Sequence, residues 1–287
     1  MSEIITLKNN DIIVEISTKG AEIQKIQSKS GTDFLWNGDA NVWSGRAPIL
    51  FPICGGLKDG KYILNGKEYS MPKHGFARKK EFTLEKSDGT SAVFLLKESE
   101  ETLQQFPYAF ELRACFTLNK NSLEVSYNVT NKSDDVMYFS TGAHEAYACP
   151  EGIEEYNIIF DKTENLKAQV LAGDILALES NTLLENSNVL PLKYEYFAID
   201  ALVINGLKSR KVTLAHKNSS KKVTVEFNNH NYFLLWTKPN ANYICIEPWC
   251  GIHDTVASDY DITKKEGIHT LNKNEQYTAT HTITVEE

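Results

Sequence analysis

The chain has 287 residues, of which 41% are hydrophobic and 24% charged, and its 38 acidic and 30 basic residues give a formal net charge of −8. This composition is typical of a folded globular protein and excludes a disordered chain, a collagen-like fibre and a disulfide-stapled mini-protein. Nucleic acid is a poor partner, because its binders usually carry a cationic face. No apolar run reaches the roughly 18 residues of a membrane-spanning helix, so no membrane partner is expected.

The N-terminus and the cysteines indicate the cellular compartment in which the protein resides. Met1, Ser2 and Glu3 lead straight into alternating sequence, without the basic and apolar regions of a signal peptide. The five cysteines are odd in number, scattered, and form no Cys-x-x-Cys pair. Such cysteines are typical of free thiols in a reducing compartment, so we expect a cytoplasmic protein.

Apolar and polar residues alternate with a period of two through most of the chain. The segments 110–118 and 123–129 each place their apolar residues on one face, and the polar residues between them predict a hairpin turn. Asn65-Gly66 is a second hairpin signal, flanked by 62–64 and Tyr69. The other predicted strands, in chain order, are 4–8, 11–17, 81–86, 92–97, 136–141, 155–160, 201–205, 211–216, 222–227, 231–237, 242–247 and 276–285.

Helical periodicity is nearly absent, and short helical turns are expected only around 100–106 and 250–260. Strands at intervals of about 8–12 residues predict an all-β sandwich or barrel. Without a linker-like segment or a fixed repeat, the chain is expected to form one domain over 1–287. The stretches 30–60 and 161–195 are expected to be irregular, and such loops often carry the chemistry of a rigid β scaffold.

Four segments hold residues capable of acid/base chemistry: Arg46 before a proline-rich turn, His74 in His-Gly-Phe, His144 after a strand-like run, and Glu247 at the end of an apolar strand. Taken singly, the arginine and each histidine are more often structural or exposed than catalytic. Glu247 differs, because a carboxylate bordering an apolar interior is costly unless it is paired and tends to have a perturbed pKa. By alternation it shares a face with Tyr243 and Cys245. His253 could line the same rim.

Several site types lack their motifs. The chain has no His-Glu-x-x-His or compact zinc-ligand group, no Gly-x-Ser-x-Gly elbow and no Walker A or Gly-x-Gly-x-x-Gly loop. A nucleophilic pair of Cys54, Cys149 or Cys245 with His74 or His144 stays open, without a local signature. What remains is a general acid/base set with nearby aromatic residues, which suits a neutral polyhydroxylated ligand.

In their order and spacing, these segments resemble the aldose 1-epimerase (galactose mutarotase-like) superfamily, and look closest to its LacX-like bacterial branch. The resemblance extends over essentially the whole chain. It implies a large antiparallel β-sandwich with an open concave sugar-binding cleft. The matching segments are Arg46 with its proline-rich turn, His74-Gly75-Phe76, Gly142-Ala143-His144 and Ile246-Glu247-Pro248-Trp249.

The family reaction interconverts the α and β anomers of an aldose. By resemblance, Glu247 is the general base that takes the C1 hydroxyl proton, and His144 is the general acid that protonates the ring oxygen. His74 and Arg46 match hydroxyl-binding positions, and Asp200 is the best match to a substrate-binding aspartate. Ring opening needs no redox change, so neither a cofactor nor a metal is expected. The expected partner is a small-molecule sugar, and the chain is expected to be a monomer or homodimer.

One residue departs from the family pattern, which commonly has proline after the second histidine. Glu145 stands there instead, and it could raise the pKa of His144, change the choice of substrate or point away. Two other functions stay open. A hexose 6-phosphate would require a cationic rim, for which Lys73 and Arg78 are candidates, although the net charge argues mildly against it. The other is a non-catalytic sugar-binding or sensing protein on the same scaffold.

Overall fold

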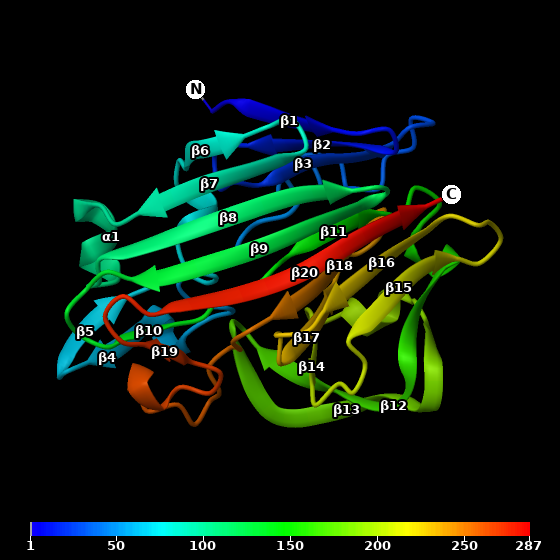
Figure 1. Cartoon of the computed structure of the whole chain (residues 1–287). Helices are drawn as coiled ribbons and strands as arrows, with labels where there is room; N and C mark the ends of the chain where they lie inside the picture. The colour runs from blue at the N-terminus through cyan, green and yellow to red at the C-terminus, as the bar shows by residue number, and fades with distance from the viewer. Residues whose placement is uncertain (1) are drawn as a thin grey trace.

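The computed structural model describes residues 2–287, and its largest element is an antiparallel β-sheet of 13 strands (Figure 1). In chain order these are β6 (Thr83–Ser87), β7 (Ser91–Lys97), β8 (Phe110–Asn119), β9 (Ser122–Asn131), β11 (Glu145–Ala148), β12 (Tyr156–Ala172), β13 (Ile175–Pro191), β14 (Leu202–Asn205), β15 (Lys211–His216), β16 (Lys222–Phe227), β17 (Tyr232–Trp236), β18 (Tyr243–Trp249) and β20 (Gln276–Glu286). Across the sheet they follow the order β11-β18-β17-β14-β12-β15-β16-β20-β9-β8-β7-β6, with β13 paired to β12.

Three smaller sheets and one α-helix complete the described part of the chain. The helix α1 has only six residues, and no helix within residues 2–287 is long and apolar enough to cross a membrane. The remaining strands and the α-helix are β1 (Ile4–Lys8), β2 (Ile12–Ser17) and β3 (Ile23–Ser28) in one sheet, β4 (Lys61–Leu64) with β5 (Lys67–Ser70), β10 (Met137–Phe139) with β19 (His269–Leu271), and α1 (Glu100–Gln105). Short 3₁₀ helices lie at Lys58–Gly60, Ala77–Lys79, Ile153–Glu155, Tyr194–Phe197 and Ile262–Lys264.

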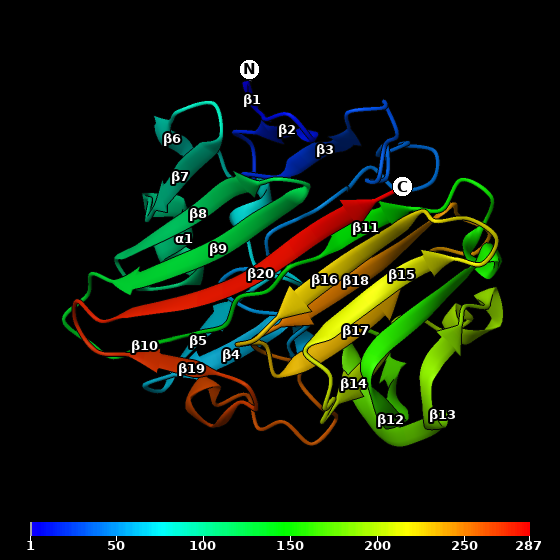
Figure 2. The ribbon, with the colours of Figure 1, turned by 45° about the vertical axis from the view of Figure 1, so that its right-hand side comes forward.

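The large sheet folds back on itself, so that β11 and β18 lie behind β20 and β16 (Figures 1 and 2). His281 on β20 contacts Glu145 on β11 across the interior, although the two strands are far apart in the strand order. A cluster of buried apolar side chains, drawn from segments between Leu7 and Val285, fills the space between the layers. The fold class is therefore the predicted antiparallel sandwich.

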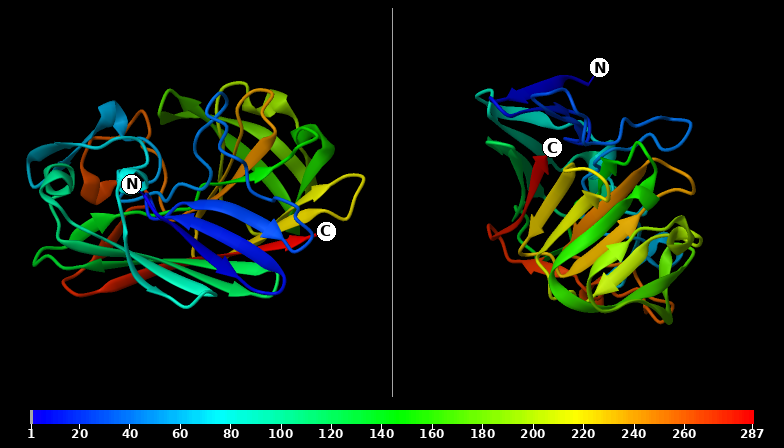
Figure 3. Two further views of the ribbon diagram at one scale, coloured as in Figure 1. Left: turned by 90° about the horizontal axis from the view of Figure 1, so that it is seen from above. Right: turned by 90° about the vertical axis from the view of Figure 1, so that its right-hand side faces the viewer.

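The long loops gather on one side of this sandwich. Seen from above, the segments around 30–60 and 250–268 lie on the side of the molecule away from β8, β9 and β20 (Figure 3, left). The stretch 30–60 holds no strand, only isolated bridges such as Leu50 with Gly142. As predicted it is irregular, and through these bridges it lies against the segment that leads into β11.

The hairpins predicted from alternation are confirmed. Strands β8 and β9 pair from Phe110 opposite Asn131 to Asn119 opposite Ser122. Strands β4 and β5 meet at Asn65-Gly66, where both residues have the positive φ that this tight turn requires. The helical turn expected at 100–106 is α1, whose first turn is capped by the Ser99 side chain.

Two predictions for other segments were wrong. The stretch 161–195 was predicted to be irregular, yet most of it forms the long curved hairpin of β12 and β13 (Figure 2). Register shifts between residues 159 and 171 break the period of two there, and β13 is mostly exposed, so no clear alternation marks the strands. The segment 250–260 has turns but no helix, because three of its backbone N–H groups donate to other segments, at Thr141, Gly56 and Leu176.

Candidate active site

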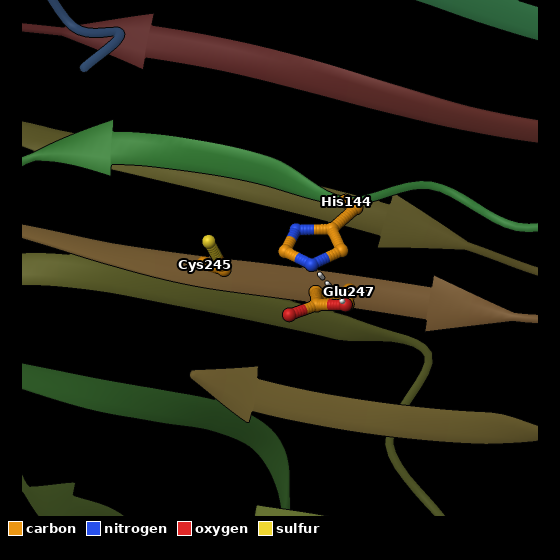
Figure 4. A group of neighbouring side chains, drawn as sticks. All are labelled: His144, Cys245 and Glu247. Carbon is orange, nitrogen blue, oxygen red and sulfur yellow. Dashed lines mark ion pairs between the residues drawn. The ribbon is translucent and has the colours of Figure 1, made fainter. Parts of the chain in front are cut away.

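His144 and Glu247 are brought together by the pairing of two strands. In the antiparallel register of β11 and β18, Glu145 lies opposite Ile246, which places His144 opposite Glu247. Directly opposed residues point to the same face of a sheet. His144 Nε2 accordingly lies 3.5 Å from Glu247 Oε2 (Figure 4), and both side chains are buried.

The predicted face of Glu247 agrees with the packing. Tyr243 and Cys245 belong to a buried cluster with Trp36 on the cleft side of β18. Ile244 and Ile246 belong to the main core on the other side. The carboxylate therefore borders the loop-covered face of the sheet, where a ligand can reach it.

His74 is held in a fixed orientation by the loop at 51–56. Its backbone N–H donates to the Gly55 carbonyl oxygen at 2.8 Å, and the Gly55 N–H donates to its Nδ1 at 3.2 Å. Because Nδ1 accepts, the neutral ring carries its proton on Nε2. The ring lies edge-on to His144, with 5.6 Å between the centroids.

These side chains line a cavity of about 210 Å³. That volume lies below the roughly 300 Å³ at which sites for drug-sized ligands begin, so it suits a single small ligand. Trp43 stacks on His144 with 5.4 Å between ring centroids, and Trp236 presents an edge to the same ring at 5.8 Å. The lining residues are Trp43, Lys73, His74, Arg78, His144, Leu171, Asp200, Ala201, Leu234, Trp236, Glu247, Trp249 and His253.

Of the predicted substrate-binding residues, Asp200 and His74 lie in this cavity and Arg46 does not. The Arg46 guanidinium donates to the Gln24 carbonyl oxygen, and its own carbonyl oxygen accepts from the Ala146 N–H at 2.8 Å. Arg46 thus supports β11 through its backbone, while its side chain bonds to Gln24 outside the cavity. The Arg46 guanidinium lies against β3, where Gln24 is found, and therefore cannot reach the cavity.

Arg78 supplies the guanidinium of the cavity instead. The short 3₁₀ turn Ala77–Lys79 folds it back so that its Nη2 donates to the Lys73 carbonyl oxygen at 3.0 Å. Its Nε is buried and has no hydrogen-bond partner among the described residues. From the sequence, Arg78 was a candidate only as a phosphate ligand. Its position four residues after His74 was the signal that could have placed it in the site.

His253 joins the same cavity, as its place near the Glu247 segment suggested. Its Nδ1 lies 2.9 Å from the Asp174 carbonyl oxygen and 3.0 Å from the Gly56 nitrogen, and its ring lies 6.3 Å from that of His74. The backbone nitrogens of Gly55 and Gly56 thus each lie beside the Nδ1 atom of one histidine. These backbone contacts fix the orientation of both imidazole rings at the cavity.

Burial perturbs the ionisation of the whole group. Desolvation, and then the nearby charge of Glu145, hold the pKa of Glu247 well above its usual range. Burial lowers the pKa of His144 and of His253 to about 3, and it also lowers the pKa of His74. The perturbed pKa values coincide with a cavity, which is characteristic of catalytic sites.

The thiols do not fit a nucleophilic role. Burial raises the pKa of Cys54 to about 12, and it also raises the pKa values of Cys149 and Cys245, so the reactive thiolate is disfavoured at each. Donor atoms of His144, Cys245 and Glu247 lie within 4.8 Å of one another (Figure 4). His144 and Glu247 line the cavity, however, and Cys245 does not.

Comparisons with known proteins all indicate the same family. The model of the family described as aldose 1-epimerase matches residues 3–284. Protein LacX from Lactococcus lactis is 37% identical over 262 residues, which cover 86% of this chain and 88% of the relative. A protein from Escherichia coli named "Putative glucose-6-phosphate 1-epimerase" is 25% identical over 63% of this chain and 62% of its own length.

The solved structures agree. The galactose mutarotase related enzyme from Lactobacillus acidophilus superposes with a TM-score of 0.94 at 32% identity, covering 99% of this chain and 98% of the other. The family resemblance predicted from the four segments is therefore confirmed, and so is the sandwich fold that it implied.

Proposed function

Because the chain belongs to the aldose 1-epimerase family, we propose that it interconverts the α and β anomers of a free hexose by general acid/base catalysis. One observation carries the proposal. A buried imidazole and a buried carboxyl group face each other 3.5 Å apart in a small cavity with aromatic walls. A protein that only binds sugar has no need of such a pair.

The reaction requires two proton transfers in each direction. Glu247 accepts the proton of the C1 hydroxyl while His144 donates a proton to the ring oxygen. The bond between C1 and the ring oxygen breaks, its electrons go to the ring oxygen, and C1 becomes an aldehyde. After rotation about the C1–C2 bond, the same two groups close the ring on the other face and recover their starting protonation. A positioned acid or base typically contributes about 10²–10⁴-fold to such a step.

The two groups share one proton. Burial disfavours the charged form of each, which in the empty cavity favours a protonated Glu247 carboxyl group and a neutral His144 ring. The catalytic form has the same number of protons, with the proton moved to His144. Hydroxyl groups of a bound sugar stabilise that charge-separated form. Lys73 favours the ionised Glu247, whereas the positive charges of Arg78 and Lys73 oppose protonation of His144.

The other cavity residues bind and polarise the sugar. The Nε2–H of His74 donates to a sugar oxygen, because Nδ1 is already occupied by the Gly55 N–H. Arg78 donates to a second oxygen and Asp200 accepts from a hydroxyl. The Trp43 and Trp236 rings offer apolar faces to the C–H groups of the sugar.

A hexose 6-phosphate is the second candidate substrate. The unpartnered buried Nε of Arg78 favours it, because guanidinium groups bind phosphate well, and the E. coli relative carries that substrate in its name. Lys73 is less available, since its Nζ lies 2.9 Å from Asp174 and 3.8 Å from Asp200. A free hexose needs no further cation, so it remains our first choice.

Anomer exchange measured by NMR tests the proposal. Pure anomers of several hexoses and of their 6-phosphates are followed with and without the protein, relative to spontaneous mutarotation. We expect acceleration of at least one free hexose. Acceleration only of the phosphates would replace the substrate and keep the chemistry. Binding of several sugars without any acceleration would instead support a non-catalytic sugar-binding protein.

A further inference from the structure

Glu145, the residue that departs from the family pattern, points away from the cavity. It follows His144 directly, and successive residues of a strand face opposite sides of the sheet. Its partner in the register is Ile246, a core residue, and its side chain is fully buried. The carboxylate therefore lies in the interior of the sandwich, directly behind the acid/base pair.

The carboxylate has one partner there. His281 Nε2 on β20 lies 2.9 Å from Glu145 Oε1, and both side chains are almost inaccessible to solvent, at 0% and 1%. The second oxygen Oε2 of Glu145 and the Nδ1 of His281 have no partner among the described residues. This single contact joins the beginning of β11 to the opposite layer of the sandwich.

We propose that Glu145 and His281 are positioning residues for the epimerase reaction: their contact holds the beginning of β11, and with it the His144 ring, in place opposite Glu247. The inference rests on the proposed function. Neither residue touches the cavity, so both act through the backbone of β11 and through the charge behind the site.

The geometry explains why a hydrogen-bonded polar pair stands in this place. A buried carboxylate with a single partner is costly in the interior, whereas an apolar residue would fill the same space without that cost. The contact is directional, however, because a hydrogen bond fixes a distance and an angle that apolar packing leaves free. A displacement of about 1 Å can reduce a catalytic rate 10²-fold, so fixing β11 has a direct effect on turnover.

The charge of Glu145 also acts on Glu247. Its negative charge opposes a second negative charge on Glu247, so removing it lowers the pKa of Glu247. Both limbs of the pH–rate profile, which depend on the shared proton, then move to lower pH. The titratable or charged groups near Glu247 are Lys73, His74, Arg78, His144, Asp200, Tyr243, Cys245 and His253. Those near Glu145 are His281, Tyr127, Tyr147 and Cys245, with His230 beside His281.

The test compares two buried glutamates of the same sheet. Glu145→Gln keeps the size but removes the charge, which weakens the hydrogen bond to His281 because a neutral amide oxygen accepts less strongly than a carboxylate. Glu164→Gln is the matched control, because Glu164 is 1% exposed on β12, accepts from Ser209 and lies outside the cavity. For Glu145→Gln we expect kcat to fall at least about tenfold with KM nearly unchanged, and the pH–rate profile to move to lower pH. Glu164→Gln should change neither kcat nor the profile.

A readout without substrate separates this inference from the proposed function. The ¹³C titration of the Glu247 carboxyl group and the His144 ring resonances are recorded by NMR for the wild type and both variants. A lower pKa of Glu247 and shifted His144 resonances in Glu145→Gln alone would support the positioning role. An unchanged titration and unchanged resonances would overturn it, whether or not the wild type epimerises a sugar.

A second variant covers a failure of Glu145→Gln to fold. The double substitution Glu145→Met with His281→Leu replaces the pair by apolar residues of similar volume. If this variant folds with wild-type kcat and pH profile, the pair is only interior packing and the inference is wrong. If it folds with a reduced kcat, the positioning role is supported. If neither variant folds, the pair serves the fold rather than the reaction, which also overturns the inference.

Discussion

At the scale of single residues, the pairing of His144 with Glu247 sets what the site can do. The two lie opposite each other on neighbouring strands, so their separation depends on the sheet register and not on a flexible loop. A site built on paired strands holds its groups more precisely than a loop does. Each group has a distinct role, and each can be tested by a substitution that preserves its shape.

Glu247→Gln and His144→Asn should each lower kcat by about 10²-fold or more, because neither amide can transfer the required proton at neutral pH. Both variants should remain folded, since glutamine matches glutamate in size, asparagine is smaller than histidine, and neither amide needs a charge in the interior. Anomer exchange and far-UV circular dichroism measure the two effects. Near-normal turnover in Glu247→Gln would show that another group is the base.

Substitutions of the two arginines should have different effects on the kinetics. Arg78→Ala should reduce kcat/KM by about 10–100-fold, because a hydrogen bond from a charged group to a ligand is worth roughly 1.5–3 kcal/mol. Arg46→Ala should leave KM within about twofold, since its guanidinium bonds to Gln24 outside the cavity. Steady-state kinetics on the best sugar decide between them. The reverse order of effects would place Arg46, and not Arg78, on the substrate.

At the scale of elements, the His-Gly-Phe segment requires glycine at position 75, because the backbone of another segment lies in close contact there. Gly75 has a φ of +70°, and a Cβ there would lie 2.2 Å from the Phe51 carbonyl oxygen. This contact, together with the bridge between Phe51 and Gly75, seats His74 against the loop at 51–56. The motif that identified the family in the sequence is therefore also a packing requirement.

Gly75→Ala should destabilise the fold by several kcal/mol, because the left-handed backbone costs about 1–3 kcal/mol for alanine and the clash adds to it. It should also lower turnover by displacing His74. Gly66→Ala is the control, since Gly66 has a similar φ of +76° but no atom within 4 Å of the added Cβ. Urea denaturation compares the two variants. Equal losses of stability would mean that the contact with Phe51 does not matter.

At the scale of the whole molecule, several histidines are buried without a charged partner. His230 is 1% exposed, its two ring nitrogens have no partner among the described residues, and burial lowers its pKa to about 3. His253 shows an effect of the same direction and size, and burial also lowers the pKa of His74. At His144 the effect is offset by the raised pKa of its neighbour Glu247. In the unfolded chain these rings would titrate near their ordinary value of 6.5.

Stability should therefore fall as the pH is lowered from 6.5 towards 3. In this window the unfolded chain binds protons that the native state excludes, and each such histidine contributes a slope of about 1.4 kcal/mol per pH unit. Urea denaturation at pH 7, 6 and 5 measures the loss. The variant His230→Leu should show a shallower dependence, by about one proton. Identical slopes in the two proteins would mean that His230 is protonated in the native state.

The local sequence by itself determined the fold class, the main hairpins and the family. Alternation is a property of neighbouring residues, and it also placed Glu247 on the face shared with Tyr243 and Cys245. Where bulges interrupt the alternation, as in β12 and β13, the same reasoning predicted an irregular stretch and was wrong. A strand that is buried on both faces, such as β11, likewise leaves no alternating pattern to read.

Only the tertiary structure decided which residues meet. Arg46 and Arg78 were both candidates for binding the substrate. In the folded chain the Arg46 guanidinium bonds to Gln24, whereas Arg78 lines the cavity. The sequence left three possibilities open for Glu145, and its contact with His281 exists only because the sheet folds back on itself. The physical reason is that periodicity reports which face a residue occupies, whereas contacts between distant segments depend on how the layers pack.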